Sequence, residues 1–103
     1  MADNLLRDFY LGFIRIHILY HARKTPVYGV ELMSELARHG YTVGPGTLYP
    51  ILHALEEKGL LSSLKEVIAG KARRYYRITL KGEQILRGAQ KQAVELINEI
   101  NEE

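Results

Sequence analysis

Residues 41–61 have the sequence YTVGPGTLYPILHALEEKGLL, and this stretch decides the fold of the chain. Its apolar residues recur at helical spacing and define one buried face, formed by Leu48, Ile51, Leu52 and Leu55. Gly59 follows at the place where a helix would end in a left-handed cap. The stretch therefore predicts a short helix that begins after small residues and ends at a glycine.

The opposite face of this predicted helix lacks the Lys and Glu side chains of an ordinary solvated surface. It carries short, stiff, hydrogen-bonding or aromatic groups, namely Thr47, Tyr49, Pro50 and His53. Pro50 cannot donate a hydrogen bond to the carbonyl of Gly46, so we expect the first turn of the helix to be loosened. A short helix with a free polar face near its N-terminus is suited to reading DNA.

The composition is typical of one soluble globular domain. The chain has 103 residues, of which 47% are hydrophobic and 25% are charged. No apolar run is long enough to span a bilayer, and the N-terminus lacks a signal-peptide layout. The absence of cysteine excludes disulfides and thiolate metal sites, and it agrees with a reducing cytosol. We therefore expect a cytoplasmic protein that does not contact a membrane and needs no cofactor.

The charge distribution is more informative than the net charge of +2. Residues 65–77 contain five basic residues and one acid, whereas residues 83–103 contain five acids and two basic residues. The first segment is therefore suited to binding anions, and the second is not.

Residues 5–23 form a predicted long helix that is apolar on most of its sides. One apolar stripe comprises Leu6, Phe9, Phe13, Ile16 and Tyr20, and a second comprises Leu11, Ile14, Ile18 and Leu19. The core of so small a domain can hardly cover both stripes, so a second subunit is the natural cover. The alternative is a compact monomer whose own core covers them.

His17 and His21 are four residues apart on this helix, a spacing that can hold zinc. No third ligand is obvious in the sequence, and no Glu follows His17 as it would in a metalloprotease motif. A zinc site needs more ligands than this pair provides, so the sequence predicts no metal site. The two histidines are expected to pack or to be solvated.

A second helix is predicted from Val30 to Arg38, followed by a short glycine-bearing turn into the third helix. This arrangement is the helix-turn-helix pattern. Residues 60–68 and 73–78 are predicted strands joined by a turn at residues 69–71, and together they form a hairpin with a basic tip. Beside a helix-turn-helix such a hairpin is the wing of a winged helix. The alternative is an ordinary exposed hairpin with solubilising charges.

The last predicted helix begins after Thr79, which is a good N-cap. Its apolar residues follow a 3-4-3-4 spacing that is typical of a helix-packing seam, at Leu86, Ala89, Ala93, Leu96 and Ile100, with Ile97 widening it. The fold class is thus mainly α with a small β-hairpin. Residues 1–78 are predicted to form a winged helix-turn-helix DNA-binding domain whose first helix is shared with the dimer interface, and residues 79–103 to form a C-terminal dimerisation helix. Folding back of this helix onto its own chain is the alternative.

The chain resembles the PadR family of bacterial transcriptional regulators over nearly its whole length. The resemblance rests on YGVEL at 28–32, GYTV at 40–43, PGTLYP at 45–50, LE at 55–56, GLL at 59–61, GK at 70–71, RRYY at 73–76 and Thr79. PGTLYP is the most specific of these. The family often has Ser or Thr at the position of Gly44, and it often has a proline in the wing at the position of Ala72. The single helix after the wing is similar to the small subfamily, whose members dimerise through that helix and the first.

The resemblance implies a sequence-specific DNA-binding regulator, most simply a repressor that binds an inverted-repeat operator as a homodimer. The residues expected to contact double-stranded DNA are Tyr28, Thr47, Tyr49, Pro50, His53, Lys71, Arg73 and Arg74. Those expected at the dimer interface are Phe9, Phe13, Leu86, Ala89, Ala93, Leu96, Ile97 and Ile100. Some family members bind planar drugs through a tryptophan, which this chain lacks.

Phe9, Tyr10 and Phe13 are the aromatic substitutes for that tryptophan. They define a candidate pocket for a small hydrophobic or aromatic effector. Two other function classes remain open. A winged helix can serve as a protein-interaction module without binding DNA, although the basic wing argues against it. An enzyme is disfavoured because Glu56 and Glu57 are adjacent on one helix, point in different directions and do not form an acid–base pair.

Overall fold

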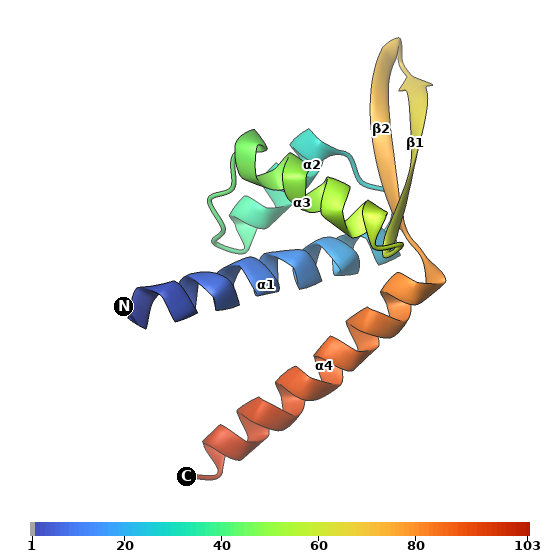
Figure 1. Ribbon diagram of the computed structural model, residues 1–103. Helices are drawn as coiled ribbons and strands as arrows, with labels where there is room; N and C mark the ends of the chain where they lie inside the picture. Colours follow the sequence, from blue (N-terminus) through green and yellow to red (C-terminus); the bar gives the residue numbers. More distant parts are fainter. Residues whose placement is uncertain (1) are drawn as a thin grey trace.

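The computed structural model describes residues 2–103, with side chains from residue 4 onward. The elements are α1 (Ala2–Lys24), α2 (Gly29–Arg38), α3 (Pro45–Glu57), β1 (Leu61–Ile68), β2 (Lys71–Ile78) and α4 (Leu80–Asn101). Figure 1 shows α1, α2 and α3 packed together, the hairpin rising beside them, and α4 leaving the hairpin as a separate helix. The predicted fold class, mainly α with a small β-hairpin and a C-terminal helix, is confirmed.

The core lies between the three N-terminal helices and the base of the hairpin. Its fully buried side chains include Ile14, Ile18 and Leu19 of α1, Leu32 and Leu36 of α2, Leu48 and Leu52 of α3, and Leu61 of β1. The apolar stripe predicted for α3 is thus buried as expected. On α1 the two apolar stripes differ in burial. The stripe that contains Ile14 and Ile18 joins the core, whereas Phe9 and Leu6 of the other stripe remain 56% and 66% exposed.

Helices α2 and α3 both end in the same glycine-dependent motif. At the end of α3 the amide of Leu60 donates to the carbonyl of Leu55 at 2.9 Å, and Gly59 takes a φ of +77°. At the end of α2 the amide of Tyr41 donates to Leu36 at 3.0 Å, and Gly40 has a φ of +91°. This is the pattern of the Schellman cap, which favours glycine because L side chains are strained at positive φ. The predicted cap at Gly59 is confirmed.

Helix α3 runs unbroken through Pro50. It begins with Pro45 in its first turn, where a missing amide costs nothing, and the carbonyl of Gly44 accepts from the amides of both Thr47 and Leu48 at 3.1 and 3.0 Å. The carbonyl that Pro50 leaves without its helical partner belongs to Gly46, an exposed residue that water can reach. The proline is therefore compatible with the helix at this position.

Strands β1 and β2 pair antiparallel from Leu61 opposite Ile78 to Ile68 opposite Lys71, so β2 begins two residues earlier than predicted. The two-residue turn between them has positive φ at both Ala69 and Gly70, as a type I′ hairpin turn requires. The sequence did not indicate a further short strand pairing between Val27 and Tyr76. Their backbones exchange two hydrogen bonds of 3.0 and 2.7 Å, which attach the segment between α1 and α2 to the wing.

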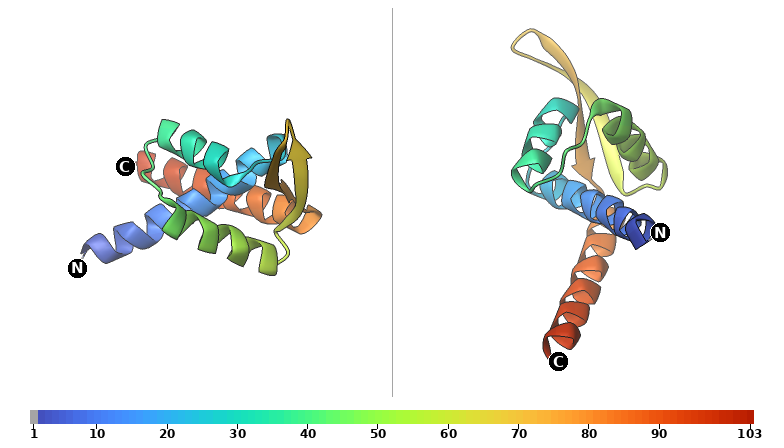
Figure 2. Two further views of the ribbon diagram at one scale, coloured as in Figure 1. Left: turned by 90° about the horizontal axis from the view of Figure 1, so that it is seen from above. Right: turned by 90° about the vertical axis from the view of Figure 1, so that its left-hand side faces the viewer.

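Helix α4 contacts α1 near the base of the wing and diverges from it toward the C-terminus (Figures 1 and 2). The hydroxyl of Thr79 accepts a hydrogen bond from the amide of Gly82 at 3.0 Å and donates one to the carbonyl of Gly59 at 2.6 Å. The predicted N-cap is confirmed, and it also ties α4 to the end of α3. Across the described residues, no helix has both the length and the apolar character of a membrane span.

Candidate nucleic-acid interface

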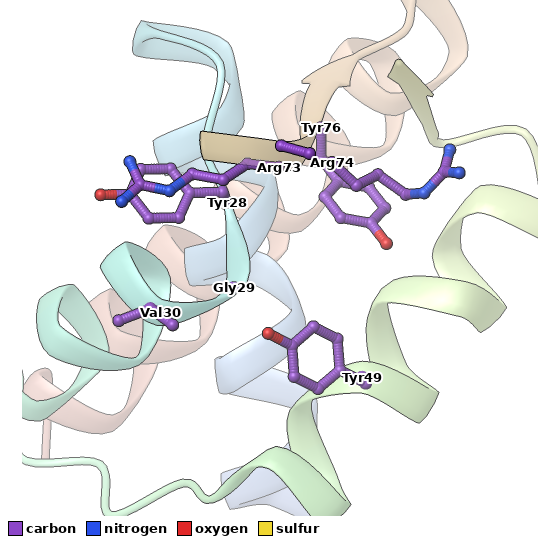
Figure 3. Close-up of a pocket in the computed structure, with 8 residues that line it drawn as sticks. Tyr28, Gly29, Val30, Tyr49, Arg73, Arg74 and Tyr76 are labelled. Carbon is purple, nitrogen blue, oxygen red and sulfur yellow. The ribbon is translucent and has the colours of Figure 1, made fainter. Parts of the chain in front are cut away.

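A cleft of about 370 Å³ opens where the N-terminus of α2, the start of α3 and strand β2 meet (Figure 3). Its lining residues are Tyr28, Gly29, Val30, Tyr49, Ala72, Arg73, Arg74 and Tyr76. Four of the residues predicted to contact DNA, from three separate elements, are therefore brought together in one place. They are Tyr28, Tyr49, Arg73 and Arg74.

Tyr28 and Arg73 form one wall of the cleft. The guanidinium carbon of Arg73 lies 4.2 Å from the centre of the Tyr28 ring, and that ring packs edge-on against Tyr75 at 5.3 Å. Tyr28 is also the N-cap residue of α2, but its side chain caps no backbone amide. The first amides of α2 therefore keep their donor capacity next to an arginine, and a helix N-terminus with free amides attracts anions.

Tyr49 of α3 leans on the start of α2, where Gly29 is buried. A β-carbon at Gly29 would lie 2.6 Å from the ring carbon Cζ of Tyr49, closer than real contacts allow. Because Gly29 has no side chain, the phenol can occupy the cleft between the two helices, as Figure 3 shows. The position of Tyr49 thus depends on a glycine in another element.

This dependence predicts the outcome of Gly29→Ala. The added methyl group would push the Tyr49 ring out of the cleft, while the alanine itself favours the first turn of α2. Since Tyr49 is partly exposed and can rotate away, we expect DNA affinity to fall while the urea midpoint of unfolding changes little. Fluorescence anisotropy with a bound duplex and urea denaturation measure the two quantities. A large loss of stability without loss of affinity would contradict this account of Tyr49.

Arg74 points away from Arg73, because successive residues of a strand face opposite sides of the sheet (Figure 3). Its Nη1 donates to the hydroxyl of Ser63 at 3.1 Å, and that hydroxyl donates to the carboxylate of Glu56 at 2.6 Å. These two hydrogen bonds link Glu56 of α3 through Ser63 of β1 to Arg74 of β2, and they orient the Arg74 side chain. Neither Ser63 nor Glu56 was expected at the site, because this contact depends on the packing of α3 against the hairpin.

The remaining predicted contacts lie outside the cleft. Thr47, Pro50 and His53 are exposed on α3, and Nε2 of His53 is 3.7 Å from the carboxylate of Glu57. Lys71 is exposed next to the turn of the hairpin, apart from the cleft.

Arg77, the other arginine of β2, differs from Arg73 and Arg74 because it forms an ion pair with a carboxylate within the wing. Its Nη2 donates to the carboxylate of Glu66 at 2.9 Å.

The residues expected at a dimer interface mostly line a second, apolar groove of about 350 Å³ between α1 and α4. Its lining residues are Phe9, Gly12, Phe13, Ile16, Ala89, Gln92, Ala93 and Leu96. The rings of Phe9 and Phe13 pack edge to face at 4.5 Å. Ile97 and Ile100 are about half exposed, at 53% and 55%, farther along α4. This surface is apolar and uncovered within the chain.

Two expectations for this region need correction. Leu86 is 5% exposed and packs in the core of its own chain, so it adds little to the surface that a second subunit could cover. Tyr10 does not line the groove with Phe9 and Phe13. Its hydroxyl accepts a hydrogen bond from the amide of Thr42 at 3.1 Å and its ring packs against Tyr41 at 5.1 Å, because it points toward the helix-turn-helix.

His17 and His21 are joined in the structure by His39, the C-cap residue of α2. Burial is the main cause that lowers the pKa of His17 and of His21, and His39 lowers the pKa of both further. Both imidazoles are therefore held toward the neutral form. The sequence did not indicate a third histidine beside this pair, because His39 is 18 residues from His21 and reaches it through the packing of α2 on α1.

Comparison with known proteins agrees with this architecture. A family model for the PadR-like family of transcriptional regulators matches residues 18–88. The chain is 47% identical over 95 residues to transcriptional regulator Rv3488 of Mycobacterium tuberculosis, a match that covers 92% of this chain and 89% of that one. These similar proteins are regulators and not enzymes, in line with the sequence prediction.

Solved structures of PadR family regulators are similar to this chain in both fold and sequence. The PadR family transcriptional regulator from Eggerthella lenta has a TM-score of 0.82 at 32% identity, covering 98% of this chain and 89% of that one. The PadR-like transcriptional regulator from Bacillus cereus has a TM-score of 0.81 at 32% identity, covering 87% and 89%. The chain therefore belongs to the PadR-like family of transcriptional regulators.

Proposed function

We propose that the chain is a sequence-specific DNA-binding repressor that acts as a homodimer on an inverted-repeat operator. The observation that supports this most is the cleft that joins the N-terminus of α2, the polar face of α3 and the arginines of β2. The cleft thus combines a helix N-terminus, a free helix face and cationic side chains. A DNA duplex offers phosphates to the amides and arginines, and base edges to the polar helix face.

In this proposal α3 is the recognition helix. Thr47, Tyr49 and His53 would reach base edges or phosphates of the major groove, and Pro50 would contact a thymine methyl group. All four are exposed, and the opposite face of α3 is buried in the core, so the polar face is free to enter a groove. These side chains are few and stiff. We therefore expect specificity to depend on shape and a small number of contacts near the helix start.

The phosphate contacts would come from the cleft and the wing. The free amides at the start of α2 and the adjacent guanidinium of Arg73 would bind one phosphate, with Tyr28 holding the arginine in place. Lys71, next to the hairpin turn, would serve backbone phosphates farther away, and Arg74 would serve phosphates or the minor groove. Such contacts supply affinity that is independent of sequence and falls as salt rises.

Dimerisation would use the exposed apolar surface of α1 and α4. The uncovered groove is lined by Phe9, Phe13, Ala89, Ala93 and Leu96. An exposed apolar patch of this kind on a small chain indicates a protein–protein contact, and in this proposal the partner is a second copy of the chain. A two-fold dimer presents two copies of α3, and these would enter successive major grooves. The operator would then contain two inverted half-sites about one helical turn apart. A dimer bound at a promoter most simply blocks polymerase, which is why we propose repression.

The same groove would admit a small hydrophobic or aromatic effector between the subunits. Such a molecule would release the DNA if it favoured a different separation of the two α3 helices, since a ligand shifts an equilibrium only through different affinities for its two states. Structures of the dimer with and without an inducer would test this. Unchanged separation of the α3 helices would rule this mechanism out.

Arg74→Ala tests DNA binding itself. Removing one phosphate contact should weaken binding across different duplex sequences and flatten the slope of log K against log salt by about one unit. Arg87→Ala removes the same charge from an exposed position on α4 and should leave the slope unchanged. Unchanged affinity of Arg74→Ala at low salt would show that Arg74 does not contact phosphate.

A further inference from the structure

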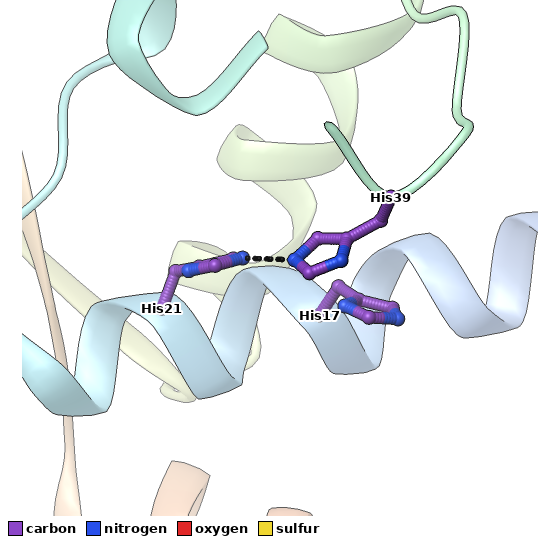
Figure 4. Close-up of side chains that lie close together, drawn as sticks. All are labelled: His17, His21 and His39. Atoms are coloured by element: carbon purple, nitrogen blue, oxygen red, sulfur yellow. Dashed lines mark hydrogen bonds between the residues drawn. The ribbon is translucent and has the colours of Figure 1, made fainter. Parts of the chain in front are cut away.

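Three of the four histidines of the chain converge at one place between α1 and the end of α2 (Figure 4). His17 and His21 lie one turn apart on α1, and His39 approaches them from the C-cap of α2. One ring nitrogen from each residue lies within 4.8 Å of the other two. The fourth histidine, His53, is exposed on α3 and belongs to no such cluster.

We infer that His17, His21 and His39 form a binding site for one divalent transition-metal ion of the zinc class. Imidazole nitrogens are suitable ligands for zinc, cobalt, nickel and copper. Three histidines with one open position form an established kind of zinc site, in which water takes the fourth place.

The distances between the ring nitrogens agree with this inference. In a tetrahedral site with Zn–N bonds of about 2.0–2.1 Å, neighbouring ligand nitrogens are about 3.3 Å apart. The Nε2 atoms of His21 and His39 are already 3.2 Å apart. His17 faces His39 with a ring separation of 4.6 Å, so a small rotation of its side chain would bring its nitrogen to the same ion.

The surroundings leave the three nitrogens available to an ion. His17 and His21 are only partly exposed, yet each still presents a ring nitrogen to the cluster. Glu35 is the carboxylate whose charge acts on His21, and it is paired with Arg38 at 3.2 Å. The only hydrogen bond described within the cluster is the one between His21 and His39, which a shared ion would replace.

The position of His39 gives the ion a structural consequence. The Schellman motif at the end of α2 fixes His39 immediately before Gly40, where the turn toward α3 begins. An ion held by all three histidines would therefore link α1 to the start of this turn. Since a ligand that binds the folded chain stabilises it, zinc should raise the melting temperature.

The test uses the full chain without a polyhistidine tag, treated with chelator and desalted. Titration with Co²⁺ should produce a visible absorption band that saturates at one ion per chain, and Zn²⁺ should displace it. His39→Gln should weaken binding more than about 100-fold, since even changes beyond the ligands cost 10–100-fold. His53→Gln is the matched control and should leave metal affinity unchanged.

A second variant and a second readout separate metal binding from folding. His17→Gln changes a partly exposed position on α1 and should lose both the Co²⁺ band and the rise in melting temperature with Zn²⁺, while keeping the helical circular dichroism of the parent. The inference is overturned if the parent chain takes up neither ion, or if replacing all three histidines leaves one bound ion per chain. None of these measurements uses DNA, so the result is independent of the proposed function.

Discussion

Gly82→Ala should destabilise the fold by about 3 kcal/mol, at the upper end of the cost of overpacking a tight contact. A β-carbon at this position would collide with the backbone carbonyl oxygen of Leu60 and would lie 2.8 Å from Cγ1 of Ile78. A backbone carbonyl cannot rotate away as a side chain can. The first turn of α4 would therefore have to move off the end of α3, and the hydrogen bond from the Gly82 amide to Thr79 would be strained.

Gly88→Ala is the matched control for this change. Gly88 lies on the same helix, is exposed and has open space around the position of a β-carbon. The same chemical change should therefore stabilise the chain by roughly 0.5–1 kcal/mol, because alanine favours a helix interior over glycine. Urea denaturation of both variants at one protein concentration measures the difference. Equal effects at the two positions would show that α4 does not pack closely against the α3–β1 turn.

Leu96→Glu should convert the proposed dimer into monomers and lower operator affinity by at least about 100-fold. Leu96 lines the apolar groove between α1 and α4. Burying an unpaired carboxylate against a second subunit costs several kcal/mol, so the subunits should separate. A monomer then binds each half-site alone and loses the gain from simultaneous engagement, which is typically 10²–10⁴-fold.

Asn98→Glu introduces the same charge on the opposite face of α4, beside Lys91 and Glu95. It should preserve both the dimer and the affinity for DNA. Sedimentation equilibrium measures the mass of each variant, and anisotropy with an operator duplex measures the affinity. A dimeric Leu96→Glu chain with parental affinity would show that the groove is not the interface.

The element order could be predicted from local sequence because each element carries its own signals. Helical spacing in 48–55, the glycine at 59 and the hydroxyl of Thr79 each act within a few residues. They place α3, its end and the start of α4 correctly. The exposed face of α3 followed directly from its buried stripe. Of the predicted contacts that line the cleft, Tyr49 lies on this face. Tyr28, Arg73 and Arg74 come from other elements and meet Tyr49 in one cleft through the packing of α2, α3 and the wing.

The features that sequence reasoning missed all depend on how distant elements pack. His39 joins His17 and His21 because the C-terminal end of α2 packs against α1. The apolar periodicity of the sequence does not predict this contact between two helices. Tyr10 is aromatic like Phe9 and Phe13, but its position one residue after Phe9 on the helix directs its side chain toward Thr42. Leu86 fits the seam of α4 by spacing, yet it lies near the base of the wing, where its own core already covers it.

The most direct test of the proposed function is selection of bound duplexes from a random double-stranded pool by the purified chain. We predict enriched sequences that contain two inverted half-sites centred about one helical turn apart, with two chains bound per duplex. Arg74→Ala should bind the same selected sequence more weakly without changing its pattern. Enrichment of no sequence, or of single or directly repeated half-sites, would contradict a two-fold dimer that reads DNA through α3.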